Sequence, residues 1–337
     1  MVMNIKHTFI LLLAILACSC TKDTDEVGAP ILFSIDGGLD VELTKSVINT
    51  DNLGSNIIKV YAEKDAVAMT DANSAVISKP NVYWNYINDA KWDDGHSYSF
   101  QGYAYNITSN KFTNVSADGR TFTVTHSSNS IADTYDYVIS RKVEVGTAES
   151  CNHPVVGLVF EHVLPSVEVY VTRSENIRTA KVTKITLSNL FSKATLKYSE
   201  KDDIWTTEID GSNTASYSIS NNTGYVVGTD KSSTSAIMSI ISVPQVFDET
   251  TELSITYKVD ERAKETDREN LVQHTQTFRL LDYVPEIRSG YRTILHVNID
   301  TGIHLNAGIV KWKEVDFIEG TVLPPIDRPQ ADPPQSD

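Results

Sequence analysis

The feature that most constrains the fold is an alternation of apolar and polar residues, with a period of two, that recurs along the chain. In TELSITYKV, the apolar residues Leu253, Ile255, Tyr257 and Val259 fall on one face. YRTILHVNID, VEVYV and YSFQGYAY repeat the pattern, and turn-forming runs such as SADGR, IDGSN and SNNTG separate these segments. This alternation is typical of half-buried β-strands. Since no segment has a long helical stripe, we expect an all-β, sandwich-like protein.

The 337 residues are more than one core usually organises, so we expect one large domain or two of medium size. A polar stretch, LKYSEKDDIW, places a junction near residue 200, with sandwiches at 31–200 and 201–320. ERAKETDRENLV (261–272) fits either a short amphipathic helix or a long polar hairpin loop. Five of the eleven prolines fall between 324 and 334, so 321–337 is predicted to be an extended tail.

The N-terminus predicts export. Lys6 precedes a short apolar run, TFILLLAILA, which is typical of a secretory signal and too short for a transmembrane helix. The run ends in ILACSC, which resembles the lipidation motif of bacterial lipoproteins. We favour Cys20 as the lipidated residue, with Cys18 as the alternative, so that 1–19 is the signal and 20–30 an acidic tether. A plain secretory signal with incidental cysteines stays open.

The residues after Cys20, TKDTDE, resemble the surface-export signal of lipoproteins in gut and oral anaerobic Gram-negative bacteria. Two or more acyl chains would make such an anchor stable. The whole chain carries a net charge of −15, and removal of residues 1–19 leaves 28 basic and 44 acidic residues, or −16. This charge argues against nucleic acid and anionic headgroups as partners. The third cysteine, Cys151, reads as a small structural residue.

No catalytic motif, cofactor motif or metal-ligand spacing is present in the sequence. KWDDGH brings together Asp93, Asp94 and His96, which could suggest acid–base or metal chemistry. Neighbouring residues of a strand point to opposite faces, however, and Asp-Gly favours a turn. We therefore interpret this stretch as a turn and expect no enzymatic activity, no cofactor and no metal.

Aromatic residues are the remaining candidates for ligand binding. Four tryptophans and fifteen tyrosines could include a platform on which sugars stack. Aromatic residues at strand spacing more often fill a core or pair across strands. We therefore favour core positions for the four tryptophans, which are Trp84, Trp92, Trp205 and Trp312.

The order of several short motifs resembles the fimbrillin family, and in particular its minor-fimbrillin-like lipoproteins. The motifs are ILFSIDGG followed by TKS, then YWNYINDAKWDDGHSYSFQGYAY, LVFEHVLPSVEVYV, KVTKITLSN, IISVPQ and GYRTILHVNI. The resemblance extends from residue 20 to about 320. It implies two tandem transthyretin-like β-sandwich domains, and it makes Phe160 and His162 structural markers. Members of this family build the stalks, tips or anchors of type V pili.

The resemblance also implies an assembly mechanism by β-strand complementation. Ile31, Phe33 and Ile35 alternate and could form a strand that plugs the protein's own groove before assembly. Lys45 lies where a trypsin-like cut would release this strand and the lipid. Lysine replaces the arginine of the best-known stalk subunits, so an uncleaved anchor or accessory subunit stays an alternative, as does an ordinary exposed lysine.

We therefore expect a fimbrial subunit or anchor lipoprotein in cell adhesion, located at the cell outer membrane and exposed at the surface or in a fimbrium. Its expected partners are other fimbrial subunits and, through the lipid, the outer membrane. A host or glycan ligand is left open. The alternative is a surface glycan-binding lipoprotein for nutrient uptake, which would need exposed aromatic side chains.

Overall fold

The computed structural model describes residues 28–35, 48–49, 53, 56–69, 77–78, 83–88, 90–106, 110–126, 130–229, 235–262 and 268–312. Cys18, Cys20, Lys45 and the proline-rich tail lie outside the described residues. The described chain is built from strands, which confirms the all-β prediction. Its helical elements include the short α1 (Thr147–Ser150) and two 3₁₀ turns, Ile131–Asp133 and Leu280–Asp282.

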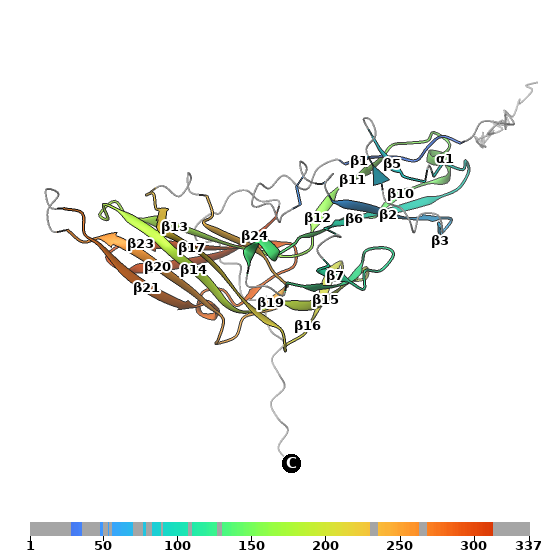
Figure 1. The fold of residues 1–337 in the computed structure, drawn as a ribbon. Helices are drawn as coiled ribbons and strands as arrows, with labels where there is room; N and C mark the ends of the chain where they lie inside the picture. The colour runs from blue at the N-terminus through green and yellow to red at the C-terminus, as the bar shows by residue number, and fades with distance from the viewer. Residues whose placement is uncertain are drawn as a thin grey trace, which may run out of the picture.

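The molecule is elongated, with the first strands of the chain at one end and most of the later ones at the other (Figure 1). Two sheets form the N-terminal end. Sheet I has the strand order β11 (Val156–Leu158), β1 (Leu32–Ile35), β5 (Trp84–Tyr86), β4 (Ile77–Ser78). Sheet II has the order β12 (Phe160–His162), β9 (Tyr137–Ser140), β6 (Tyr98–Tyr105), β2 (Ile57–Lys64), β3 (Val67–Ala68), and β10 (Val143–Val145) also pairs with β6.

Three further sheets complete the described fold. Sheet III lies near the middle, with the order β16 (Ile204–Ile209), β15 (Lys193–Ser199), β8 (Thr121–Thr125), β7 (Phe112–Thr113). Sheet IV has the order β18 (Met238–Ile241), β13 (Ser166–Arg173), β23 (Tyr291–Ile299), β24 (Ile303–Lys311). Sheet V has the order β17 (Thr214–Val226), β14 (Ala180–Phe191), β20 (Glu252–Asp260), β21 (Leu271–Arg279). A two-stranded ribbon joins β19 (Gln245–Val246) to β22 (Glu286–Ile287).

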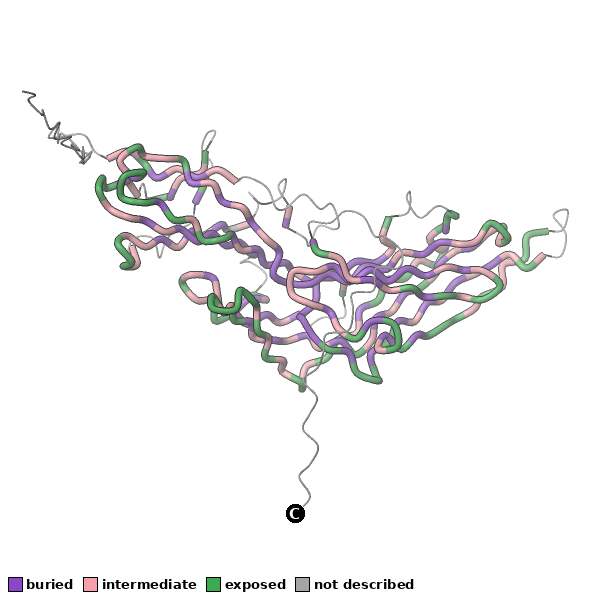
Figure 2. The backbone as a smooth tube through the Cα atoms, turned by 180° about the vertical axis from the view of Figure 1, so that it is seen from behind, coloured by how far each residue is buried: buried purple, intermediate pink, exposed green. Residues whose placement is uncertain are grey.

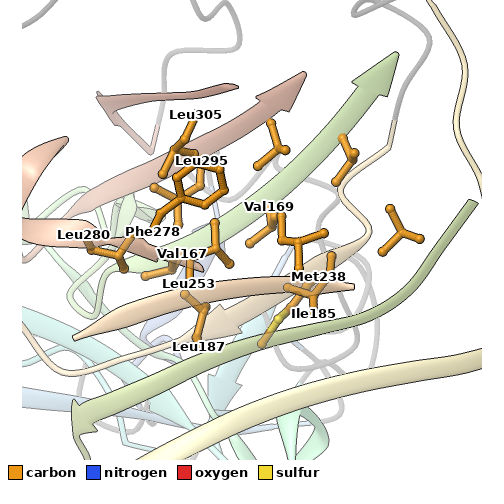
Figure 3. Close-up of a cluster of buried hydrophobic side chains, with 14 of the residues drawn as sticks. Val167, Val169, Ile185, Leu187, Met238, Leu253, Phe278, Leu280, Leu295 and Leu305 are labelled. Atoms are coloured by element: carbon orange, nitrogen blue, oxygen red, sulfur yellow. The ribbon is translucent and has the colours of Figure 1, made fainter. Parts of the chain in front are cut away.

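The packing of the C-terminal end follows directly from the alternation of apolar and polar residues along its strands. Val167, Val169 and Val171 of β13 point from sheet IV toward sheet V, where the apolar face of β20 meets them. Figure 3 shows Val167 and Val169 packed with Leu253, Leu295 and others in one mostly aliphatic cluster. Removing these branched side chains from water is the main favourable contribution to this half.

Sheet II is a middle layer, because alternate residues of β6 face different cores. Phe100 and Ala104 pack against sheet I, whereas Tyr103 and Tyr105 pack against sheet III. Both faces of β6 are therefore buried, unlike the half-buried strand that its sequence predicts. Figure 2 shows the buried backbone concentrated along the inner strands of both ends.

Two further sequence interpretations can be compared with the fold. Strands β20 and β21 pair from Glu252↔Arg279 to Asp260↔Leu271, so the stretch 261–270 joins a hairpin, as one of the two readings predicted. β13 and β14 precede residue 200 yet pair with strands that follow it. β15 and β16 span residue 200 and join β8 of the N-terminal part. The division into two sandwiches near residue 200 stays a prediction.

Candidate functional site

The segment 28–35 lies between two other parts of sheet I and bonds to both. Ahead of β1, the Ile31 amide donates to the Ala90 carbonyl and the Trp92 amide donates to the Ala29 carbonyl, both at 2.9 Å. Within β1, Leu32 and Phe33 pair antiparallel with β5, and residues 33–35 pair parallel with β11. The backbone of this short segment therefore fills a slot whose two edges would otherwise carry unpaired amides and carbonyls.

The side chains of the segment explain why the slot is apolar. Ile31 and Phe33 are fully buried, and the half-buried Ile35 packs against the same cluster. The ring of Phe33 meets Tyr86 edge-on at 5.1 Å and Phe100 at 5.6 Å between centroids. Edge-to-face pairs of this kind add to the free energy gained by burial. The three residues predicted to form a plug strand thus lie together in the N-terminal core.

A buried polar network holds the chain just beyond the undescribed residues 36–47. The Ile48 amide donates to Asp136 Oδ2 at 3.1 Å, and His162 Nδ1 lies 2.7 Å from the same oxygen. The His162 ring stacks on Trp312 at 4.0 Å, and the indole N–H of Trp312 donates to the Leu164 carbonyl at 3.0 Å. These contacts fit the role of structural marker expected for His162.

Phe160, the other expected marker, is fully buried in the N-terminal core. Sequence reasoning did not single out Asp136. No local signal marks this residue, since its partners lie 88 and 26 positions away in the chain.

The tryptophans do not form one exposed platform. Trp92 and Trp312 are buried in two different cores, while Trp84 packs beside the N-terminal core and Trp205 beside the central one. The preference for core positions is confirmed for Trp92 and Trp312, and Trp84 and Trp205 are half-buried.

The KWDDGH stretch forms the predicted turn, with Gly95 at a φ of +80°, a conformation that glycine adopts without strain. Around the turn, His96 Nδ1 lies 2.5 Å from Asp65 Oδ2 and His96 Nε2 lies 3.5 Å from Asp93 Oδ2. The hydrogen bond with His96, followed by that from the Ser97 amide, lowers the pKa of Asp65 to about 2. All these groups lie at an exposed tip, and the contacts are those of a surface ion-pair network.

The other candidates for chemistry have structural surroundings. The Cys151 thiol lies at the end of α1, 3.5 Å from the Thr147 carbonyl. Among the described residues, no group of three or more histidine, cysteine or acidic side chains is arranged to hold a metal. No helix in the described part of the chain is long and apolar enough to cross a membrane.

The model of the fimbrillin-like family matches residues 44–312, so the chain belongs to the fimbrillin-like family. This membership confirms the resemblance seen in the sequence and the expectation of a non-enzymatic protein.

Solved structures agree on the fold. A fimbrial protein from Bacteroides vulgatus superimposes with a TM-score of 0.52 and 18% identity, over 83% of this chain and 99% of that one. A candidate cell adhesion protein from Bacteroides uniformis superimposes with a TM-score of 0.50 and 13% identity, over 83% of this chain and 98% of that one. Another candidate cell adhesion protein, from Bacteroides ovatus, superimposes with a TM-score of 0.50 and 14% identity, over 86% of this chain and 100% of that one. No curated protein matches the sequence.

Proposed function

We propose that this protein is a fimbrial subunit or anchor that takes part in cell adhesion and joins other subunits by β-strand complementation. The observation that carries the proposal is the position of β1 in sheet I, paired on both sides and with Ile31 and Phe33 fully buried. Loss of the segment would expose apolar side chains and two rows of backbone groups. An extended strand from another subunit would cover both at once.

The network around Asp136 supports this mechanism. The chain is held at β1 and again at Ile48, on either side of Lys45. A cut after Lys45 would free the segment 28–35 while the new N-terminus stays attached to Asp136. The N-terminal residues would carry the lipid at Cys20, or at Cys18, and tether the uncleaved protein to the outer membrane.

The test uses limited proteolysis with a lysine-specific protease, followed by size-exclusion chromatography. Cleavage at Lys45 is expected to be early and to convert monomer into oligomers. K45A should block the conversion without changing the unfolding temperature. K45R is the matched control, because it should resist the lysine-specific protease and become sensitive to an arginine-specific one. Rapid cleavage to a product that stays monomeric would contradict activated self-assembly, whereas a monomer that resists cleavage at Lys45 would fit the anchor or accessory role.

The anchor is tested separately by metabolic labelling with a fatty acid analogue. C20A should abolish labelling and release the protein from the membrane fraction, whereas C18A should not. Loss of labelling in C18A alone would move the lipid to Cys18. Labelling that neither change affects would refute the lipoprotein assignment.

A further inference from the structure

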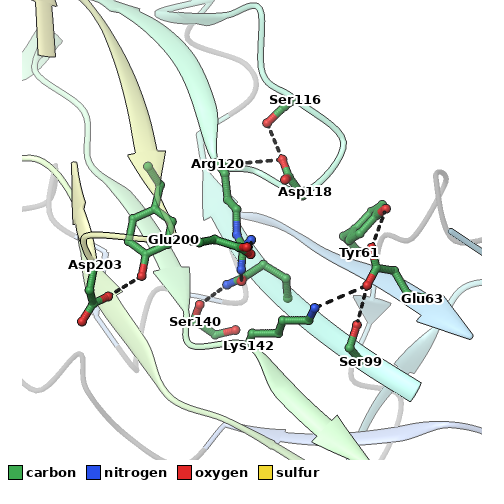
Figure 4. Close-up of polar contacts among 12 residues, drawn as sticks. Tyr61, Glu63, Ser99, Ser116, Asp118, Arg120, Ser140, Lys142, Glu200 and Asp203 are labelled. Carbon is green, nitrogen blue, oxygen red and sulfur yellow. Dashed lines mark hydrogen bonds and ion pairs between the residues drawn. The ribbon is translucent and has the colours of Figure 1, made fainter. Parts of the chain in front are cut away.

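A polar cleft opens where sheets II and III diverge, outside the segment assigned to assembly. Its volume is about 510 Å³, which is in the range of small-molecule sites. One wall comes from β6, β9 and β12, and the other comes from β15, β16 and the residue before β8. Figure 4 shows Arg120 beside Glu200 on one wall, and Lys142 of the other wall directed toward Glu63.

The cleft is the open edge of the central core, and the same strands build both. Residues with the same parity along a strand share a face, and on β8 and β15 this face carries Val124, Phe122, Ala194 and Leu196 inside the core. Two residues further toward the edge, the same face carries Arg120 just before β8 and Tyr198 on β15. On β6, Tyr105 and Tyr103 are likewise followed by Gln101. On all three strands, the side chains that face the core therefore change from core residues to hydrogen-bonding residues at the same distance from the edge.

Arg120 is the central side chain of the cleft. One of its terminal nitrogens pairs with Glu200, and the other donates to Gln101 Oε1 at 2.9 Å. Its guanidinium also lies 5.5 Å from the centre of the Tyr198 ring. The Nε atom is buried and has no hydrogen-bond partner among the described residues. A buried donor without a partner is costly, so Arg120 keeps one unsatisfied polar group next to the cleft.

Two half-buried aromatic rings form the adjoining wall. The centroids of Tyr198 and Trp205 are 5.5 Å apart, with the rings tilted by 53°. Asp203 accepts a hydrogen bond from the Tyr198 hydroxyl, and its backbone has a φ of +54°. Non-glycine residues rarely adopt this conformation, and here it aims a carboxylate at the wall of the cleft.

The charges of the cleft are balanced within the protein. Arg120 pairs with Glu200, Arg141 lies 2.8 Å from Glu161, and Lys142 lies 3.4 Å from the carboxylate of Glu63. An anionic ligand would have to compete with these carboxylates and approach a chain of net charge −15. A neutral ligand rich in hydroxyl groups can instead bond to guanidinium donors and carboxylate acceptors at the same time.

We propose that this cleft binds a neutral saccharide, with a pyranose ring against Tyr198 and Trp205 and its hydroxyl groups bonded to Arg120, Glu200 and Asp203. The volume admits a mono- or disaccharide. The C–H face of a sugar ring is apolar and packs on an aromatic ring, while its hydroxyl groups need donors and acceptors such as Arg120, Glu200 and Asp203, which lie beside the two rings on the same wall. The proposal adds a ligand to a fimbrial subunit and does not depend on strand complementation.

The test titrates the purified full-length protein in detergent with neutral mono- and disaccharides and follows tryptophan fluorescence and the heat of binding. Titration to about 10 mM fills roughly nine-tenths of a site with a Kd of about 1 mM. At least one neutral sugar of the panel should bind and change the fluorescence. W205F should abolish most of the fluorescence change, because the other three tryptophans lie outside the cleft.

Two conservative variants test the polar wall. E200Q and D203N keep the shape of each side chain, and asparagine tolerates the backbone conformation of Asp203. Each should weaken binding about tenfold, which is the usual loss for a hydrogen bond to a charged group. E208Q is the matched control, because Glu208 lies on the exposed face of β16 and should leave binding unchanged. Thermal unfolding of each variant verifies the fold.

Three results would overturn the proposal. The first is no binding of any neutral sugar by the wild-type protein. The second is binding that E200Q and D203N leave unchanged, which would put the sugar elsewhere. The third is binding of sialic or uronic acids alone, which would refute the charge argument. None of these results bears on proteolytic assembly, which is measured on the same protein without sugar.

Discussion

The strands of sheets I and V are held together by different kinds of contact. The strands of sheet I are two to four residues long, whereas β14 has 12 residues, β17 has 13, and β20 and β21 have nine each. A long ladder distributes its stability over many cooperative hydrogen bonds. A short strand such as β1 has few backbone bonds and depends on the burial of its side chains. The comparison suggests that β1 can open locally while sheet V stays closed.

The two cores differ in the same sense. The N-terminal core uses aromatic rings, among them Phe33, Tyr86 and Phe100, whereas the C-terminal core is mostly valine, isoleucine and leucine. A few large side chains can supply much apolar area from a short strand. Many branched side chains suit long strands on a pleated surface. The short strand β1 is thus held by a few large contacts, and the C-terminal half by many small ones.

The largest expected effect comes from breaking a buried ion pair in the C-terminal half. Glu168 is fully buried and accepts from Arg292 Nε and NH2, both at 2.8 Å, and from Ser166 and Tyr170. Burial acts to lower the pKa of Arg292, but the hydrogen bond and charge of Glu168 raise it above its ordinary value. R292L leaves a buried carboxylate without its cation and should cost about 3–5 kcal/mol in urea unfolding.

The double variant E168L/R292L is the control for this experiment. It removes both charges, so it should recover much of the stability lost in R292L. The N-terminal amides of sheet I should lose protection in R292L only through global unfolding. A change confined to sheet I would contradict the assignment of this pair to the body of the subunit.

The next effect tests the short strand directly. F33A removes a fully buried ring that contacts Tyr86 and Phe100, and substitutions of this kind cost about 3 kcal/mol or more. We expect this loss of stability to appear as local opening of sheet I. Hydrogen exchange should become faster in β5 and β11 and stay unchanged in β14 and β20. S34A, on the other face of β1, is the matched control and should change exchange little. Equal loss of protection in both halves would refute the comparison.

The sequence predicts strands well where only neighbours along the chain matter. The alternation in β13 and β20 places Val167 and Leu253 on the correct faces. It does not reveal that Glu168 and Arg292, on the opposite face, are also buried, because that depends on parallel pairing between strands 124 residues apart. The polar cleft could not be foreseen for the same reason. Arg120 and Glu200 meet through the pairing of β8 with β15, which no local pattern specifies.

A third prediction concerns the joint between the two halves and its dependence on pH. His126 is buried beside Tyr135, with its Nε2 atom 3.1 Å from the Tyr135 carbonyl, and its own carbonyl accepts from Tyr217. Burial lowers the pKa of His126 from 6.5 to about 4, and nearby Lys111 acts in the same direction. Between these values the unfolded chain binds the proton and the folded chain does not. Stability therefore falls as the pH is lowered from 6.5 toward 4, by about 3 kcal/mol.

The measurement compares urea unfolding of the wild-type protein and H126Q at pH 7 and near pH 4. Glutamine can bond to Tyr135 but does not titrate, so H126Q should lose about 3 kcal/mol less on acidification. Carboxylates elsewhere titrate equally in both proteins and cancel from the difference. Parallel pH curves for the two proteins would show that His126 does not control acid stability.

The smallest effect concerns a bulge that lets the long strand β14 bend. Between Leu187 and Leu190 the register with β17 shifts, and Asn189 has a φ of +59° there while its side-chain amide donates to the Thr250 carbonyl at 2.8 Å. N189A and N189G both remove that hydrogen bond, but only alanine is strained in the left-handed conformation. N189A should therefore be less stable than N189G by about 1 kcal/mol in urea unfolding. Because the bulge belongs to sheet V, the difference in stability between N189A and N189G should appear in global unfolding. The ratio of hydrogen-exchange rates between β1 and β14 should stay the same in the two variants. Equal stability of the two variants would mean that β14 relaxes at this position and that its ladder is less rigid than its length implies.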